Sequence, residues 1–384
     1  MSDETVRFVH TADLQLGMTR RFLDEDAQAR YSQARTDTLV AIGRLAAQRH
    51  AEFVVVAGDV FETNRVRPRT VGRALEAIAT IPVPVYLLPG NHDPLDAASV
   101  YGSPTFLRDL PPNVVVLDSP VPREVRAGVE VVGAPWTSKR PLRDLVGDVI
   151  ESLPDDPSCV RILVGHGAVD SFIDFDNPAA IRLAAAERGL EEGRVRYIAL
   201  GDRHSTTEVG TSGRIWYSGS PGPTAHDEIE AGNVLLVEAS RDHCEVTREA
   251  IGTWKYVSGT FDLDGAEAIP ELAAWLTSLP SKDRSIVRLN LAGVISLTTF
   301  TELETLLARS TDVFGSIEEW EPTSQLIIRP DDDDFSDLGL RGFAQHAVER
   351  LRVMATSDQA DADVARDALA LLVRLANGQS LDPA

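Results

Sequence analysis

The sequence predicts a layered α/β protein, and three observations indicate this class. Residues 1 to about 250 alternate short apolar runs with stretches of helical periodicity, such as residues 34–48 and 71–80. Five of the apolar runs are followed within a few residues by a side chain that can bind a metal ion. Beyond about residue 250 these motifs stop and a smaller α+β pattern begins. Alternating strands and helices are typical of sheets covered by helices.

Each of the five motifs directly follows a predicted strand, and this position indicates a common site. In chain order, the runs and the polar residues that follow them are 6–9 with Asp13 and Gln15, 53–56 with Asp59, 85–88 with Asn91, His92 and Asp93, 160–164 with His166, and 197–200 with Asp202 and His204. Strands of a sheet deliver their ends to a common rim, where open α/β sheets bind ligands. We therefore expect these side chains to converge on one site.

The later elements are predicted from shorter patterns. Residues 214–217 and 233–237 read as antiparallel strands that complete a sheet, and a boundary near residue 252 closes a first domain, 1–252. Strand-like segments at 257–263, 285–291 and 324–328, with helix-like segments at 271–279 and 297–309, predict a small α+β capping domain over 253–330.

Residues 331–384 are predicted to form an acidic linker and a helical hairpin. Four consecutive carboxylates at 331–334 indicate an exposed, solvated linker. Apolar residues then recur at helical spacing, first Phe343, Ala347 and Leu351, and then Val364, Ala368, Leu371, Leu372 and Leu375. These apolar stripes either pack on each other and on the body of the protein, or dock a partner helix.

Composition excludes several classes of protein. The 384 residues suggest two or three domains, and 43% hydrophobic and 25% charged residues are ordinary globular values. No apolar run of about 18 residues appears, and the start is acidic where a signal peptide is basic. Cys159 and Cys244 are too few for a disulfide framework. We therefore expect a cytoplasmic protein that does not cross a membrane.

The formal net charge of -22 counts against strong binding to nucleic acid by this chain alone, because phosphate-binding surfaces normally carry excess Lys and Arg. Local basic clusters nevertheless follow the first two motifs and the segment 133–136. Their members are Arg20, Arg21, Arg65, Arg67, Arg69, Lys139 and Arg140. They are either a DNA track beside the site or a solvated face balanced by nearby acids.

The residue types of the five motifs suit phosphoester hydrolysis. Two divalent cations about 4 Å apart can clamp a phosphoryl group, activate a water and stabilise the leaving oxygen. Asp59 is the natural bridging carboxylate, with Asp13 on one ion, and Asn91 and His166 on the other. His92 is placed as a general acid, because imidazole titrates near neutral pH. Asp93 either orients His92 or caps a turn.

Each motif alone is weak evidence, but together they resemble a known family. The stretches that carry the resemblance are His10-Thr11-Ala12-Asp13, Ala57-Gly58-Asp59-Val60-Phe61, Pro89-Gly90-Asn91-His92-Asp93, Ala199-Leu200-Gly201 and Tyr217-Ser218-Gly219-Ser220-Pro221. Through them the chain resembles the calcineurin-like metallophosphoesterases, and within these the SbcD-type DNA repair nuclease subunits. The resemblance covers residues 5 to about 240, whereas the cap and tail fit only by position and length.

The resemblance implies a fold, an activity and partners. The fold is a four-layer sandwich of two mixed sheets flanked by helices, with a small α+β cap and a C-terminal helical hairpin. The activity is manganese-dependent hydrolysis of DNA phosphodiester bonds, as exonuclease and endonuclease, with two divalent ions and with magnesium as the alternative to manganese. The implied partners are DNA, an SbcC-like ATPase that binds the C-terminal helices, and a second copy of the chain.

Two positions depart from the family pattern. Gln15 and Asp202 stand where the family has histidines. Carried over position by position, Asp13, Gln15, Asp59 and His204 hold the first metal, and Asp59, Asn91, His166 and Asp202 hold the second. Oxygen ligands in place of nitrogen favour manganese or magnesium over zinc. The competing interpretation is a weakened site, because a neutral glutamine is a poor ligand.

Three functions stay open at this level. The first is an SbcD-type DNA repair nuclease that works with an ATPase. The second is a phosphodiesterase or phosphatase that acts on a nucleotide or another small phosphoester. The third is a partner-binding subunit that keeps the fold and has weakened metal affinity.

Overall fold

The structure is a computed structural model, which describes residues 5–156, 158–173, 175, 177–264, 267–320, 324–328, 343–355, 361–362, 364–365 and 368–369. The chain divides into two compact units, Met1–Lys255 and Tyr256–Ala384. The predicted acidic linker and most of the second helix of the predicted hairpin lie outside the described residues. The separation of residues 331–384 from the cap stays a prediction.

The first unit contains two six-stranded mixed sheets. The first sheet has the order β12-β11-β1-β2-β3-β4, formed by β12 (Cys244–Ala250), β11 (Asn233–Ala239), β1 (Val6–Thr11), β2 (Phe53–Val56), β3 (Val85–Leu87) and β4 (Val114–Val116). The second has the order β5-β6-β7-β8-β10-β9, formed by β5 (Arg123–Arg126), β6 (Val129–Gly133), β7 (Val160–His166), β8 (Tyr197–Gly201), β10 (Ile215–Tyr217) and β9 (Thr207–Val209). Most central strands pair in parallel, so their carboxyl ends reach a common rim.

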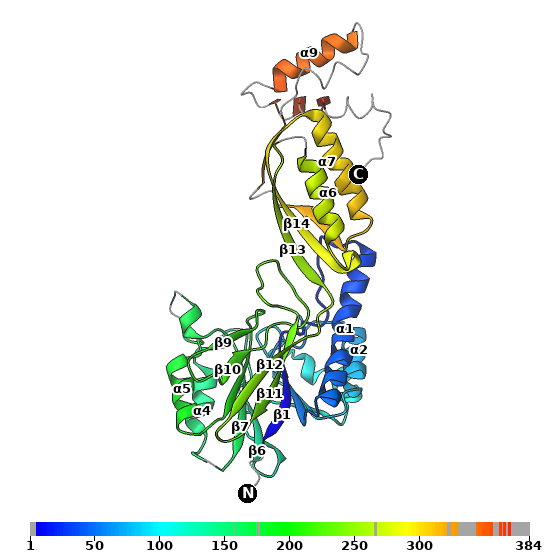
Figure 1. Cartoon of the computed structure of the whole chain (residues 1–384). Helices are drawn as coiled ribbons and strands as arrows, with labels where there is room; N and C mark the ends of the chain where they lie inside the picture. The colour runs from blue at the N-terminus through cyan, green and yellow to red at the C-terminus, as the bar shows by residue number, and fades with distance from the viewer. Residues whose placement is uncertain are drawn as a thin grey trace. The chain divides into compact units, whose positions relative to one another are not determined.

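Helices cover the outer face of each sheet (Figure 1). The first sheet packs against α1 (Glu25–Gln48), α2 (Pro68–Ala79) and α3 (Pro104–Asp109), and the second against α4 (Leu145–Ser152) and α5 (Leu183–Glu191). The single-turn helices η1 (Val100–Gly102) and η2 (Asp170–Phe172) lie in loops. A third apolar cluster fills the space between the sheets. The predicted sandwich of two mixed sheets flanked by helices is therefore confirmed.

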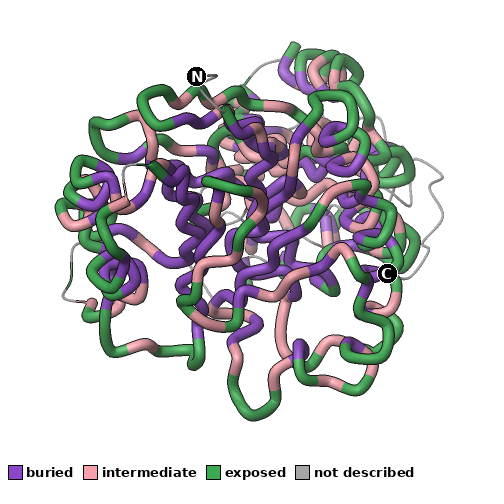
Figure 2. Tube along the Cα trace, turned by 90° about the horizontal axis from the view of Figure 1, so that it is seen from below, coloured by how far each residue is buried: buried purple, intermediate pink, exposed green. Residues whose placement is uncertain are grey.

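The alternation of side chains along each strand explains the layers. In β1, Phe8 points to the cluster between the sheets, and Val9 points to the cluster beneath the helices. In β2, Phe53 and Val54 divide in the same way. Successive residues of a strand point to opposite faces, so a run that is apolar throughout must be buried on both sides. Figure 2 shows buried segments in the interior and more exposed segments around them.

Two sequence expectations need correction. The pattern predicts a helix from about residue 34, whereas α1 begins at Glu25, because the Asp24 side chain caps its first turn by accepting a hydrogen bond from the Ala27 N–H (2.7 Å). The pattern also predicts antiparallel strands after Gly210 that complete one sheet. The single sheet is wrong: β10 lies in the second sheet, parallel to β8 and antiparallel to β9, whereas β11 and β12 run antiparallel on the first. Strand β9 takes the edge of the second sheet, and the chain then reverses again into β10.

A buried histidine bridges the two sheets of the first unit. His10 in β1 is fully buried; its Nε2–H donates to the Leu200 carbonyl (3.2 Å), and its Nδ1 accepts from the Tyr197 hydroxyl (3.1 Å). Burial lowers the pKa of His10 from 6.5 to about 3, because the charged imidazolium would lose its hydration.

This histidine should make folding sensitive to mild acid. The folded state keeps His10 neutral, so its contribution to stability is complete above pH 6.5 and is lost as the pH falls through 6.5 toward 3. Between pH 7.5 and 5.0 we expect the wild-type chain to lose about 2 kcal/mol more unfolding free energy than His10→Gln, which cannot titrate. Urea unfolding curves of both proteins at the two pH values measure the difference. A difference that does not change with pH would contradict the assignment.

The second unit is a small α+β fold. Strand β14 (Ser285–Ile295) lies between β13 (Lys255–Asp262) and β15 (Ser316–Glu319), and it also pairs with β16 (Gln325–Ile328). One core cluster joins the sheet to α6 (Ala268–Ser278) and α7 (Leu297–Thr311); η3 (Lys282–Arg284) precedes β14. Helix α9 (Phe343–Ala355) packs Val348 and Ala355 against Leu297 of α7. Part of the apolar face of α9 is thus covered within this unit.

None of the helices in the described part of the chain is long and apolar enough to cross a membrane.

Candidate metal centre

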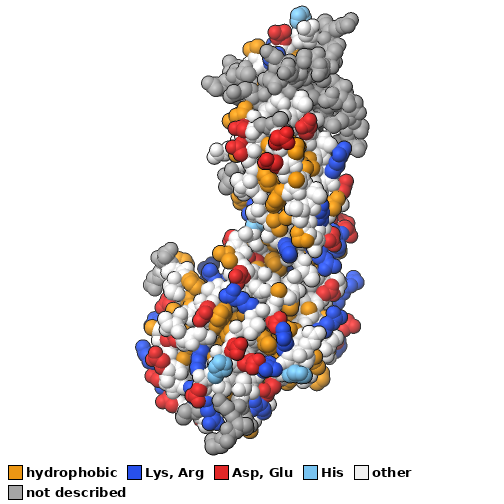
Figure 3. Space-filling view, in the orientation of Figure 1, with side chains coloured by type: hydrophobic (Ala, Val, Ile, Leu, Met, Phe, Trp, Pro, Cys, Tyr) orange, Lys and Arg blue, Asp and Glu red, His pale blue; other side chains and the backbone are white. Residues whose placement is uncertain are grey.

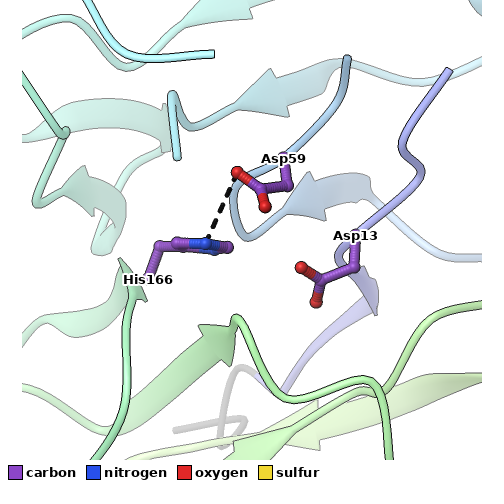
Figure 4. Close-up of side chains that lie close together, drawn as sticks. All are labelled: Asp13, Asp59 and His166. Carbon is purple, nitrogen blue, oxygen red and sulfur yellow. Dashed lines mark ion pairs between the residues drawn. The ribbon is translucent and has the colours of Figure 1, made fainter. Parts of the chain in front are cut away.

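The predicted ligands gather where strands of both sheets end. Asp13 follows β1, Asp59 follows β2 and His166 ends β7, and one ligand atom from each lies within 4.8 Å of the others. All three side chains are buried. Figure 4 shows Asp13 and Asp59 approaching His166 from across the gap between the sheets. Two sheets thus contribute to one centre.

The other predicted ligands surround this trio. Asn91 Oδ1 lies 3.0 Å from His166 Nε2, and Asp202 Oδ1 lies 3.7 Å from the same nitrogen. On the opposite side, His204 Nε2 lies 3.8 Å from Asp13 Oδ1. It also lies 3.2 Å from Gln15 Nε2. The structure therefore brings together all seven predicted ligands, including the two that depart from the family pattern.

The backbone of the ligand loops adopts an uncommon conformation. Asp13, Gln15, Asp59 and Asp202 have φ angles of 53°, 43°, 54° and 95°. They are four of the seven non-glycine residues with positive φ in the described part of the chain. Such conformations cost on the order of 1–3 kcal/mol each and persist where the surrounding structure holds them. Their concentration here marks a functional site.

Two glycines let the ligand loops approach closely. A Cβ atom at Gly58 would lie 2.1 Å from His166 Nδ1, and one at Gly90 would lie 2.2 Å from Asp59 Oδ1. Gly58 also has a positive φ of 91°. Glycine precedes Asp59 and Asn91 in the sequence because any side chain there would push the ligands apart.

Burial and the charges of neighbouring groups shift the pKa values of the ionisable side chains in the centre. Burial raises the pKa of Asp13 to about 7. Burial alone would lower the pKa of His166, but the charges of Asp59, Asp13 and Asp202 outweigh it and raise that pKa well above its usual value. Burial alone would raise the pKa of Asp59, but the neighbouring His166 brings it below the ordinary range. The carboxylates thus favour the protonated, positively charged form of the buried His166 imidazole. A divalent cation can replace that positive charge among the carboxylates.

His92 lies beside the ligands with one ring nitrogen fixed. Its Nδ1–H donates to the Glu62 carbonyl (2.9 Å), and its Nε2 lies 4.0 Å from Asp59 Oδ2. The His92 backbone N–H donates to Asp59 Oδ1 (2.9 Å). The side chain is 39% exposed. Its Nε2 can therefore meet a substrate at the open side of the centre.

Asp93 is buried and joins two loops. It accepts hydrogen bonds from the Gly90 N–H (2.8 Å), the Phe61 N–H (3.0 Å) and the Tyr101 hydroxyl (2.8 Å). Burial raises its pKa to about 6. These contacts hold the turn that carries Asn91 and His92 against the loop that carries Asp59.

The predicted DNA-facing residues lie on loops that leave the centre. Arg65, Arg67 and Arg69 are exposed, and a Cβ atom at Gly17 would lie 2.9 Å from the Val66 side chain, so the first ligand loop runs beside this segment. Lys139 and Arg140 are exposed and follow the loop of Trp136, which donates from its ring nitrogen to the His166 carbonyl (2.7 Å).

The remaining two arginines differ from each other. Arg21 is exposed, whereas Arg20 donates to the Thr224 carbonyl (2.6 Å) and so supports a loop. Figure 3 shows basic and acidic side chains interspersed over the visible face of the first unit. The described residues on that face form no broad basic surface.

Sequence reasoning missed several residues that shape the centre. Arg35 is only 4% exposed and donates to the Leu14 carbonyl (2.9 Å) and the Gly222 carbonyl (3.2 Å), which ties two site loops together. Its helical spacing from Leu39 could have placed it on the buried face of α1. Thr224 and Glu228 contact His204 through a loop whose sequence carries no comparable signal.

The donor set fits divalent cations. Gln15 Oε1 is buried and has no hydrogen-bond partner in the described structure, and the Nε2 atom of the same amide lies 3.2 Å from His204 Nε2. Carboxylate and amide oxygens suit manganese or magnesium, and imidazole suits the transition metals. Rotation of the terminal amide exchanges its oxygen and nitrogen, so Gln15 can turn its oxygen to a cation held beside His204.

Fold and site together define an α/β protein with a candidate metal centre at the strand ends. The calcineurin-like phosphoesterase family model matches residues 6–206, more than half of the chain. The chain therefore belongs to the calcineurin-like phosphoesterase family, whose fold implies divalent metal ions.

Two archaeal relatives share the name DNA double-strand break repair protein Mre11. The Methanosarcina acetivorans protein is 26% identical over 373 residues, 93% of this chain and 56% of the relative. The Methanosarcina mazei protein is 26% identical over 322 residues, 79% of this chain and 48% of the relative. The chain thus spans about half the length of these curated relatives. A dimetal phosphatase from Danio rerio is 14% identical and covers 63% of this chain and 98% of its own, with a TM-score of 0.35.

Proposed function

We propose that the protein is a DNA repair nuclease of the SbcD type that hydrolyses phosphodiester bonds at the described centre. The observation that carries the proposal is the convergence of all seven predicted ligands at the strand ends, with His92 beside them. Support for DNA as the substrate comes from the Mre11 relatives and from the exposed arginines beside the first ligand loop.

The ligands divide into two groups that share Asp59. Asp13, Gln15, Asp59 and His204 would hold one divalent ion, and Asp59, Asn91, His166 and Asp202 the other. Bound manganese or magnesium would supply Lewis-acid activation of the phosphoryl group and of water. Because Nδ1–H of His92 donates to the Glu62 carbonyl, Nε2 is the nitrogen that would carry the second proton of the imidazolium and give it to the leaving oxygen. Asp93 keeps the turn of His92 in place through its three hydrogen bonds.

The proposed partners follow from the same resemblance. DNA would run along Arg21, Arg65, Arg67 and Arg69, with Lys139 and Arg140 on a separate loop. The chain is acidic, so an SbcC-like ATPase bound to the C-terminal helices would supply much of the DNA affinity. Residues 253–330 would act as the cap, and a second copy of the chain would complete a dimer.

Hydrolysis of three substrates tests the proposal. With manganese, the full chain should hydrolyse linear duplex DNA, single-stranded DNA and a simple phosphate bis-ester, with and without a partner ATPase. Activity on the bis-ester without any on DNA, even with the ATPase, would favour a small-phosphoester enzyme. Absence of both hydrolysis and manganese binding would indicate a partner-binding subunit.

Charge reversal of the exposed arginines should weaken DNA binding without changing hydrolysis of a small substrate. We expect the double variant Arg65→Glu with Arg67→Glu to weaken DNA binding and to lower the slope of log affinity against log salt by about 2, one for each lost phosphate contact. Hydrolysis of the bis-ester should be unchanged. The control is Arg188→Glu, an exposed arginine on α5. Equal effects of both charge reversals on DNA binding would refute a track at this loop.

A further inference from the structure

Glu228 places a nearly buried carboxylate behind one of the predicted ligands. It lies in the loop between β10 and β11, and only 6% of its side chain is exposed. Its Oε1 lies 2.9 Å from His204 Nδ1, and its Oε2 accepts from the Thr224 N–H (2.9 Å). The Thr224 hydroxyl also donates to Oε1. The carboxylate is therefore held by contacts within its own loop and aimed at His204.

This contact places a hydrogen on His204 Nδ1, which also lies 2.8 Å from the Thr224 hydroxyl oxygen. An ionised carboxylate only accepts hydrogen bonds, so His204 Nδ1 must carry the hydrogen. With an ion bound, Nε2 would then be the nitrogen that gives its lone pair to the ion. That atom faces Asp13 Oδ1 at 3.8 Å and the Gln15 amide at 3.2 Å. The lone pair thus points at the other ligands of the first metal subsite.

The ligands of the first metal subsite make the orientation of His204 important in this chain. Gln15 contributes a neutral amide to the first subsite, so His204 is its one imidazole ligand in the proposed set. A carboxylate hydrogen-bonded to a ligating histidine fixes the ring and makes it a stronger donor. Such a carboxylate offsets part of the affinity that an amide ligand loses.

We propose that Glu228 is a positioning residue for the first divalent cation, acting through His204 and compensating for Gln15. The inference rests on the proposed two-ion centre and deepens it. Glu228 does not itself reach the ion. Its role is to hold Nδ1–H of His204 in a fixed hydrogen bond, so that the ring is turned with Nε2 toward the ion.

Manganese binding to the full chain tests this role directly. Isothermal titration of metal-free wild type, Glu228→Gln and Glu228→Ala measures both binding events. In Glu228→Ala we expect one of the two affinities to fall roughly 10- to 100-fold while the other is unchanged. Glu228→Gln should lie between, because an amide oxygen still accepts from Nδ1–H but lacks the charge.

A matched control separates positioning from bulk charge. Glu230 lies in the same loop, its side chain is 50% exposed, and it pairs with Arg248. Glu230→Gln removes the same charge away from His204 and should leave both affinities unchanged. Thermal unfolding of the metal-free variants confirms that they are folded.

Nitrogen chemical shifts of the His204 ring provide a readout that is independent of activity. In metal-free wild type we expect the shift of an Nδ1–H that is hydrogen-bonded to a carboxylate, and in Glu228→Ala a changed Nδ1 shift because that bond is lost. Unchanged shifts with unchanged manganese affinity in Glu228→Ala, or an equal loss in Glu230→Gln, would overturn the inference while the proposed function stands. A wild-type chain that binds no manganese would overturn both.

Discussion

Asp59→Asn should abolish hydrolysis. The carboxylate lies between the two groups of ligands, with His166 Nε2 at 3.5 Å and the His92 N–H at 2.9 Å from Oδ1. An asparagine keeps the shape but removes the charge that both ions would share. We expect rates on duplex DNA and on a bis-ester to fall at least about a thousandfold, equivalent to roughly 4 kcal/mol of transition-state stabilisation. Initial rates at saturating manganese measure the loss.

Asp96→Asn is the control for this substitution. Asp96 is exposed, follows the turn of His92 in the sequence, and accepts from the Ala98 N–H (2.8 Å). It should keep wild-type rates. Calorimetry should show that Asp59→Asn also weakens both manganese binding events. Hydrolysis of all substrates that survives the Asp59 change would contradict the two-ion centre.

His92→Ala should slow hydrolysis of DNA while manganese still binds. The His92 Nε2 is free to meet the leaving oxygen, and no predicted ligand set includes it. Loss of a general acid typically costs 10²- to 10⁴-fold in rate, and we expect about that loss in kcat on DNA. Single-turnover rates on duplex DNA, with calorimetry for manganese, measure the two properties separately.

Substrates with different leaving groups show whether His92 is a general acid or has only a structural role. A bis-ester of 4-nitrophenol releases a stable phenolate, which hardly needs a proton. His92→Ala should therefore lose far less activity on this substrate than on DNA. The control His243→Ala removes an exposed histidine in a hairpin turn and should act as wild type on both. Equal losses on the two substrates would show that His92 is not the acid.

The layered fold and the position of the centre could be predicted from the sequence because both are local properties. Runs such as residues 53–56 are apolar on both faces, which only a covered sheet can satisfy. Each motif follows its own strand directly, so the strand carries the ligand to the rim wherever the strand lies. Helix boundaries were less predictable, as α1 shows, because the Asp24 cap precedes nine residues without a clear apolar pattern.

The pairing of strands that lie far apart in the sequence could not be predicted in this way. The parallel register of β10 and β8 depends on β9 taking the sheet edge, which no local pattern announces. Arg35 and Glu228 act on the centre from a helix and from a loop, through contacts with residues far away in the sequence. Their residue types alone indicate a solvated charge.

The sequence by itself determined the class of fold, the inventory of ligands and the two altered positions, Gln15 and Asp202, since these depend on residue type and on order along the chain. Only the tertiary structure decided how the ligands face one another. The sheet order brings His204 to Gln15 and Asp13, and the loop after β10 brings Glu228 behind His204. The physical reason is that a strand fixes where its own end lies, whereas the partners of a side chain depend on which strands and loops become neighbours.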